Sequence, residues 1–190
     1  SYLDQVWATH RALREAGATV DVVRPGRDLT GYRLVVVPGL HLVRDHEAAT
    51  VDAAVRAGAH ALVTFYSGIV DEDDRVRPGG YPGVWRDLLG IRVEEFSPVL
   101  PGDEVLLESG IRASLWTERL TATDADVIDR FSGGPADTLP ALTRRRGTDG
   151  AGDAWYLATL PDAAGLARII DQALTAAGAE RAAGARPGVD

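Results

Sequence analysis

The stretch Tyr32-Arg33-Leu34-Val35-Val36-Val37-Pro38-Gly39 decides the fold class of this chain. Its centre is a continuous apolar run rich in β-branched residues, and Pro38-Gly39 ends it. A run without polar alternation is typical of a strand that is covered on both faces, as in a parallel sheet between helices. We therefore predict a buried parallel strand over residues 34–37.

The segments on either side of this strand favour helices and a second strand. Residues 3–16 and 45–57 carry apolar side chains at helical spacing, and a glycine directly follows each segment. Asp45 is predicted to be the N-cap of the second helix. Another apolar run, at residues 61–65, predicts the next strand. Strand, helix and strand in this order indicate a parallel sheet with right-handed crossovers.

The second half of the chain predicts strands that are too closely spaced for crossover helices. They are expected near residues 91–96, 103–108, 112–121, 126–131, 139–145 and 153–159. We expect them to pair in antiparallel fashion, before a final helix from about residue 162 to 177. The predicted fold class is therefore α/β: a three-layer, mostly parallel, flavodoxin-like sheet with antiparallel strands in its second half.

The beginning of the chain departs from the usual order of such a fold. Residues 19–23 predict a short strand, yet the chain opens with the helix that ordinarily follows a first strand. It also starts with Ser and contains no Met, so we expect a fragment of a larger protein. Our hypothesis is that a preceding strand is omitted, and continuous pairing between residues 19–23 and 34–37 would contradict it. Residues 1–178 are predicted to form the domain and residues 179–190 a tail or linker.

Composition excludes several classes of partner. The net charge of −8 argues against nucleic acid, and we expect the one basic cluster, Arg144-Arg145-Arg146, to be an exposed strand end. The absence of Cys excludes disulfides and thiolate metal sites. No apolar stretch reaches the roughly 20 residues of a membrane span, and no signal peptide is visible. We therefore predict a cytoplasmic protein that does not bind membranes.

A possible nucleophile follows the second buried strand, in Thr64-Phe65-Tyr66-Ser67-Gly68. A nucleophile elbow needs small residues two positions before and after the nucleophile, whereas Ser67 has Phe65 and Ile69 there. All four histidines precede Ser67, which excludes the chain order of α/β-hydrolases but not every triad. We predict that Ser67 is a turn residue. The alternative function is a small amidotransferase-like or esterase-like hydrolase that uses Ser67.

No metal, cofactor or catalytic residue is predicted. The acidic run Asp71-Glu72-Asp73-Asp74 fails the calcium-loop pattern at its fifth, sixth and twelfth positions, and two nearby arginines favour a solvated or interface loop. Gly79–Gly83 precedes a helix and could bind an anion, but it lacks the glycine motifs of nucleotide sites. His41 and His46 flank a helix start without a third zinc ligand.

Several segments occur in an order that matches a known family: Tyr32–Pro38, Thr64–Glu72, Gly79–Gly83, Arg86–Gly90 and Val93–Phe96. The most specific parts are Ser-Gly-Ile-Val-Asp-Glu at residues 67–72 and Gly-Gly-Tyr-Pro-Gly at residues 79–83. From about residue 2 to about residue 178, the series resembles the trimerisation domain of bacterial β-galactosidases of glycoside hydrolase family 42.

The resemblance implies a parent enzyme that hydrolyses terminal β-D-galactosides. In that family an N-terminal TIM barrel carries two glutamates, the acid/base and the nucleophile of a retaining mechanism. None of its catalytic or galactose-binding residues can be placed on this chain. The domain itself is implied to be class I glutamine amidotransferase-like in fold, to lack the nucleophile, and to assemble the enzyme into a homotrimer. The tail is implied to lead toward a small β domain.

We predict that the interface lies on the polar loop after the second strand, because aromatic residues and arginine are enriched at interfaces. The candidate residues are Tyr66, Ser67, Asp71, Glu72, Tyr81 and Trp85. A cyclic trimer uses heterologous contacts, so a second, different surface should face this one. A third interpretation is a small-molecule-binding module with its site at the carboxyl ends of the strands.

Overall fold

The apolar run predicted to be a buried strand is β1 (Leu34–Val37), and it pairs in parallel with β2 (His60–Thr64). In this computed structural model, which describes residues 2–182, the other edge of β2 pairs in parallel with β9 (Ala154–Leu157). The helix α2 (Asp45–Arg56) connects β1 to β2. The predicted strand–helix–strand unit is therefore confirmed.

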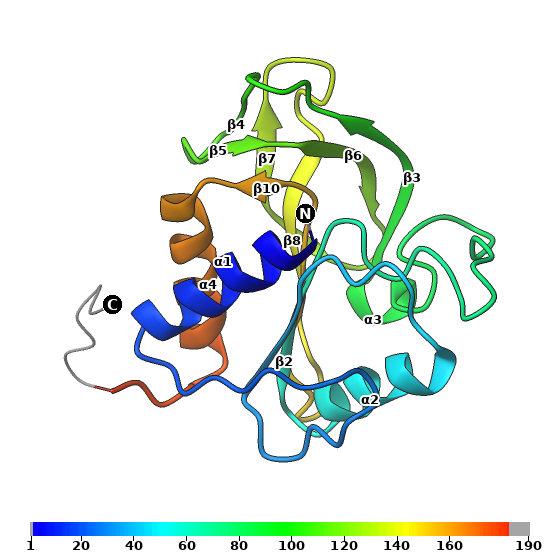
Figure 1. The fold of residues 1–190 in the computed structure, drawn as a ribbon, viewed down its shortest axis with the longest axis vertical. Coiled ribbons are helices and arrows are strands. Elements are labelled where there is room, and N and C mark those ends of the chain that lie inside the picture. Colours follow the sequence, from blue (N-terminus) through cyan, green and yellow to red (C-terminus); the bar gives the residue numbers. More distant parts are fainter. Residues whose placement is uncertain (1, 183–190) are drawn as a thin grey trace.

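The remaining strands of the main sheet continue from β9, each antiparallel to its neighbour. In sheet order they are β8 (Pro140–Arg145), β7 (Asp126–Ser132), β4 (Val105–Leu107), β5 (Arg112–Ser114) and β10 (Leu160–Pro161). A separate antiparallel pair consists of β3 (Ile91–Pro98) and β6 (Trp116–Ala122). Figure 1 shows the main sheet curling, so that β4, β5 and β10 lie across the end of β7 and β8.

The predicted three-layer, mostly parallel fold, flavodoxin-like or glutamine amidotransferase-like, is wrong. Only β1–β2 and β2–β9 are parallel in this curled, eight-stranded mixed sheet. Parallel neighbours need long crossover connections, and the short spacings between consecutive strands after residue 90 allow only antiparallel pairing between them. Helices flank the parallel end of the sheet: α1 (Tyr2–Glu15) and α4 (Ala163–Ala176) lie on one side of β2, and α2 and α3 (Arg86–Leu89) on the other (Figure 1).

Two helix starts show how the sequence sets local structure. The Asp162 carboxylate accepts the N–H of Gly165 at 2.7 Å and caps α4, whose buried Leu166, Ile170 and Leu174 follow at helical spacing. The prediction that Asp45 caps α2 is wrong. Arg44 occupies the N-cap position, and the side chain of Glu47 accepts its N–H at 2.9 Å.

The strand predicted at residues 19–23 is not present. This segment is extended but pairs with no strand, and β1 forms the edge of the sheet. The residues from Leu34 to Val36 are therefore only partly buried, although their sequence suits a strand covered on both sides. Of the predicted tail, Ala182 donates its N–H to the carbonyl of Gly17 at 2.9 Å, and residues 183–190 lie outside the described residues.

Candidate functional site

A cluster of rings near the carboxyl end of β2 forms the main candidate surface. We call it the aromatic surface, and it consists of His41, Tyr66, Tyr81, Phe96 and Trp116. The His41 ring stacks on Tyr66 with centroids 4.7 Å apart, and Trp116 meets Tyr66 edge-on at 5.2 Å. Phe96 stacks on Trp116 at 4.7 Å and lies 5.8 Å from Tyr81. Such pairs contribute about 0.5–1.5 kcal/mol each, so the rings support one another in fixed positions.

A buried carboxyl group, that of Glu118, is hydrogen-bonded to the aromatic surface. Glu118 on β6 accepts hydrogen bonds from the Tyr156 hydroxyl at 2.7 Å and from Trp116 Nε1 at 3.0 Å. The backbone N–H of Tyr66 also donates to it. Burial raises the pKa of Glu118 to about 7, and the three hydrogen bonds oppose that rise. Because Tyr156 belongs to β9, Glu118 fastens the β3–β6 pair to the main sheet.

The tight turn after β2 is centred on Tyr66 rather than Ser67. Tyr66 has a φ of 64°, unusual for a residue other than glycine, and Thr64 and Gly68 stand two positions on either side. This pair of small residues around Tyr66, rather than the residues around Ser67, was the sequence signal for the turn. The turn directs the Tyr66 N–H to Glu118 and its ring between His41 and Trp116.

Ser67 is a buried residue of this turn, with 0% of its surface exposed. Its Oγ accepts the N–H of Leu40 at 3.1 Å and donates to the carbonyl of Val37 at 3.4 Å. No histidine is hydrogen-bonded to it within residues 2–182. The alternative function as a Ser67 hydrolase therefore has neither a base beside the hydroxyl nor a path for substrate.

The predicted interface residues are divided between surface and core. Tyr66 is 38% exposed, and Asp71, Glu72 and Tyr81 are exposed or partly exposed. Trp85, like Ser67, is buried, and its Nε1 donates to the carbonyl of Ala48 on α2 at 3.5 Å. Neither Ser67 nor Trp85 presents its side chain to a partner here, which corrects the prediction for these two residues.

The aromatic surface also contains three residues that the predicted interface left out, namely His41, Phe96 and Trp116. Phe96 is 39% exposed, close to the value for Tyr66. Trp116 and Glu118 are two residues apart on β6, so their side chains share one face of the strand. An aromatic and an acidic residue at this spacing were the available signal, but the sequence does not indicate which face is buried.

The acidic run forms a local turn, and one of the two nearby arginines forms an ion pair with it. Asp71 Oδ1 accepts the N–H groups of Asp73 and Arg75, each at 3.0 Å, and the Arg75 side chain pairs with Asp73 at 3.0 Å. These hydrogen bonds, that from Arg75 most strongly, lower the pKa of Asp71. Arg77 instead pairs with Asp45 at 2.7 Å, which ties the loop to the start of α2.

The basic cluster at the end of β8 is neutralised by aspartates. Arg144, Arg145 and Arg146 pair with Asp153, Asp124 and Asp126 at 2.6, 2.9 and 2.9 Å, respectively. In the part of the chain that the structure describes, no group of three or more His, Asp or Glu side chains could hold a metal ion. No helix among the same residues is long and apolar enough to cross a membrane.

The curled mixed sheet defines a class of α/β domain that occurs within larger glycoside hydrolases. The crystal structure of β-galactosidase from Bacillus circulans sp. alkalophilus matches with a TM-score of 0.89 and 29% identity, over 95% of this chain and 28% of that one. The β-galactosidase of the haloarchaeon Halorubrum lacusprofundi matches with a TM-score of 0.89 and 29% identity, over 96% and 28%.

The chain belongs to the β-galactosidase trimerisation domain family of glycoside hydrolase family 42, whose family model matches residues 1–180. A β-galactosidase of Arthrobacter sp. is 46% identical over 189 residues, which cover 100% of this chain and 27% of that protein. A β-galactosidase of Geobacillus sp. is 38% identical over 174 residues, which cover 90% and 26%. The chain thus spans little more than a quarter of the length of these relatives.

Proposed function

We propose that this domain holds together a homotrimeric β-galactosidase through contacts made by its aromatic surface. The observation that carries the proposal is a preformed set of rings, two of them more than one-third exposed, above a buried carboxyl group. Aromatic residues supply much of the energy of protein–protein contacts because they bury large areas at little entropic cost. The family and the relatives, which are named β-galactosidases, support this assignment.

In this proposal catalysis takes place elsewhere in the parent polypeptide. Hydrolysis of terminal β-D-galactosides belongs to a TIM barrel outside residues 1–190, with two glutamates in a retaining mechanism. Residues 1–178 act as the assembly domain, and residues 179–190 lead to the rest of the chain. The parent works in the cytoplasm and has no nucleic-acid or membrane partner.

A cyclic trimer constrains the surface that faces the aromatic surface. Three subunits around one axis make heterologous contacts, so the rings of one subunit meet a different surface of the next. Asp71 and Glu72 follow Tyr66 in the same loop and would lie at the polar rim of the contact. Added salt should therefore weaken the association of the subunits less than the loss of one ring does.

The test is light scattering on the full-length parent carrying Phe96→Ser. Phe96 is exposed, and its loss removes the stacking on Trp116 without opening the core. We expect the trimer to dissociate, whereas the control Ile128→Ser, at an exposed position of β7, should remain trimeric. A monomeric wild-type parent would refute the assembly function. A trimeric Phe96→Ser parent would show that another surface makes the contact.

A further inference from the structure

Three hydrogen-bond donors converge on the carboxyl group of Glu118. The Tyr156 hydroxyl lies 2.7 Å from Oε2, Trp116 Nε1 lies 3.0 Å from Oε1, and the backbone N–H of Tyr66 is the third donor. Phe96 is directly opposite Glu118 in the register of β3 with β6, so both side chains lie on the face that also carries Trp116. The carboxyl group is thus bonded to two residues of the aromatic surface and neighbours a third.

Only the ionised carboxyl group of Glu118 can satisfy all three donors. A carboxylate accepts at both oxygens, whereas a protonated carboxyl group has an O–H that itself needs an acceptor. Two of the three donors are N–H groups, which cannot accept, and within residues 2–182 the Tyr156 hydroxyl bonds to Glu118 alone. If Tyr156 accepts the proton, its own O–H loses its acceptor. Protonation therefore leaves at least one hydrogen without a partner.

Burial opposes ionisation, so the two states of Glu118 are close in free energy at neutral pH. The side chain is 3% exposed, and burial raises its pKa to about 7 although the three hydrogen bonds lower it. Among the described residues, no charged side chain contributes to this pKa. A change of one pH unit around 7 is therefore enough to change the balance between a form that fits the donors and one that does not.

The groups that face Glu118 from the surrounding elements are uncharged or belong to the aromatic surface. The charged side chains of β3, β6 and β8 form ion pairs instead: Arg92 with Glu94 at 3.9 Å, Glu95 with Arg119 at 3.5 Å, Arg144 with Asp153 at 2.6 Å and Arg145 with Asp124 at 2.9 Å. His41 stacks on Tyr66 and belongs to a residue type that titrates around neutral pH. An experiment has to separate its effect from that of Glu118.

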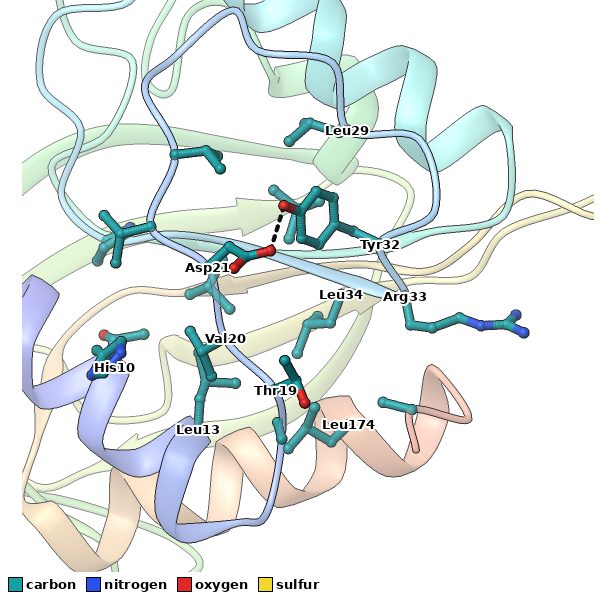
Figure 2. Close-up of a pocket in the computed structure, with 18 of the residues that line it drawn as sticks. His10, Leu13, Thr19, Val20, Asp21, Leu29, Tyr32, Arg33, Leu34 and Leu174 are labelled. Atoms are coloured by element: carbon teal, nitrogen blue, oxygen red, sulfur yellow. Dashed lines mark hydrogen bonds between the residues drawn. The ribbon is translucent and has the colours of Figure 1, made fainter. Parts of the chain in front are cut away.

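A second set of titratable side chains lies in a separate cavity of about 450 Å³. Figure 2 shows His10, Asp21 and Tyr32 there, with the Tyr32 hydroxyl donating to Asp21 Oδ2 at 2.8 Å. This hydrogen bond raises the pKa of Tyr32 above its ordinary value, away from the neutral range. Neither Glu118 nor a residue of the aromatic surface lines this cavity. His10 is therefore a histidine control away from the aromatic surface.

We propose that protonation of Glu118 controls the aromatic surface: the ionised form fixes Tyr66 and Trp116 in the geometry that meets a partner, and the protonated form releases them. Tyr66 depends on this hydrogen bond because a φ of 64° is unfavourable for a residue other than glycine. The consequence for assembly rests on the function proposed above. Association of the subunits should weaken as pH falls, whereas the domain itself becomes more resistant to unfolding.

The test measures assembly and the aromatic surface separately in the full-length parent at pH 6, 7 and 8. Mass photometry of a dilution series gives the concentration at which half of the subunits are free. With a pKa of about 7, the ionised fraction falls from about nine-tenths at pH 8 to about one-tenth at pH 6, so each contact weakens about 10-fold. Three such contacts should raise that concentration roughly 30-fold, because it varies as the square root of the trimer dissociation constant.

Hydrogen exchange of the Tyr66 amide, corrected for the intrinsic effect of pH, reports on the surface itself. It should be about 10-fold faster at pH 6 than at pH 8, the effect of one lost hydrogen bond to a charged group. Glu118→Gln, which like the protonated acid has one acceptor oxygen and a donor, should show the pH 6 values at every pH. Tyr156→Phe removes a hydrogen bond that lowers the pKa of Glu118, so both transitions should move to higher pH.

His10→Gln and His41→Gln are the controls, and both should keep the pH dependence of the wild type. The proposal is overturned if wild-type assembly and Tyr66 exchange stay constant from pH 6 to 8, or if the dependence survives Glu118→Gln and disappears in His41→Gln. Weaker assembly together with lower resistance to urea at pH 8 in Glu118→Gln would show a merely structural role. A parent that is monomeric at every pH would refute the assembly function alone, and the exchange of the Tyr66 amide would still decide the role of Glu118.

Discussion

Replacing Glu118 with Gln should remove a large part of the pH dependence of this domain's stability. The carboxyl group is 3% exposed and accepts hydrogen bonds from Tyr156 and Trp116 at 2.7 and 3.0 Å. Burial raises its pKa from 4.5 to about 7. Gln has nearly the same shape, can still accept the Trp116 N–H, and cannot ionise, so the substitution isolates the charge.

The sign and size of the effect follow from proton binding in the two states. Between pH 4.5 and 7 the folded protein retains the proton of Glu118, whereas the unfolded chain releases it. The free energy of unfolding therefore falls as pH rises through this range, and the contribution is fully lost above the folded pKa. At about 1.4 kcal/mol per pKa unit, the loss amounts to about 3 kcal/mol. The free energy of unfolding of Glu118→Gln, measured relative to that of the wild type, should therefore rise by up to about 3 kcal/mol between pH 4.5 and pH 8.

The assay is urea unfolding of both proteins at pH 4.5, 6, 7 and 8, followed by tryptophan fluorescence. The wild type should lose stability with rising pH relative to Glu118→Gln, and the two curves should diverge mainly between pH 5 and 7. Glu104→Gln, at an exposed position, is the control and should parallel the wild type. Parallel curves for wild type and Glu118→Gln would refute the reasoning, because they would mean that Glu118 ionises equally in both states.

Two further predictions concern single positions in the fold. Gly90→Ala should destabilise the domain by about 2 kcal/mol or more in urea, because φ is 61° and the new Cβ would lie 2.5 Å from a backbone carbonyl oxygen. Gly110→Ala, with φ of 82° and open space around it, should cost only about 1 kcal/mol, and equal losses would contradict the steric argument. Asp153→Asn should cost about 2 kcal/mol in the same assay, since it weakens a largely buried pair with Arg144. Asp126→Asn, in an exposed pair, should cost less than about 1 kcal/mol, and a similar loss at both positions would show that burial is not the cause.

Much of the local structure could be predicted from the sequence because it depends on neighbours in the chain. The apolar run at residues 34–37 forms β1, and the spacing of Leu166, Ile170 and Leu174 places them on the buried face of α4. The family could likewise be identified from short motifs such as residues 67–72, because turn residues and their spacing can be read directly from the order of residues in the chain. The strand at residues 19–23 could not be predicted correctly, because a strand forms only when another strand lies beside it.

The candidate site was predictable only in part. The loop that begins at Tyr66 could be located, because aromatic and polar residues cluster there in the sequence. Trp85, in contrast, looks equally suited to an interface until its burial against α2 is known. Glu118 is one of 28 acidic residues, and nothing in the neighbouring sequence distinguishes it from an exposed carboxylate.

By itself the sequence determined the helices, most of the strands and the family, and it suggested the hypothesis that a strand preceding the first helix is omitted. The tertiary structure alone decided that β9 pairs with β2, that the sheet curls into antiparallel strands, and that β3 and β6 form a separate pair. It also decided that Glu118, Trp116 and Tyr66 meet, although the chain separates the last two by fifty residues. The physical reason is that side-chain periodicity and turn chemistry act over a few residues, whereas strand partners and buried charges are selected by packing between segments that are distant in the chain.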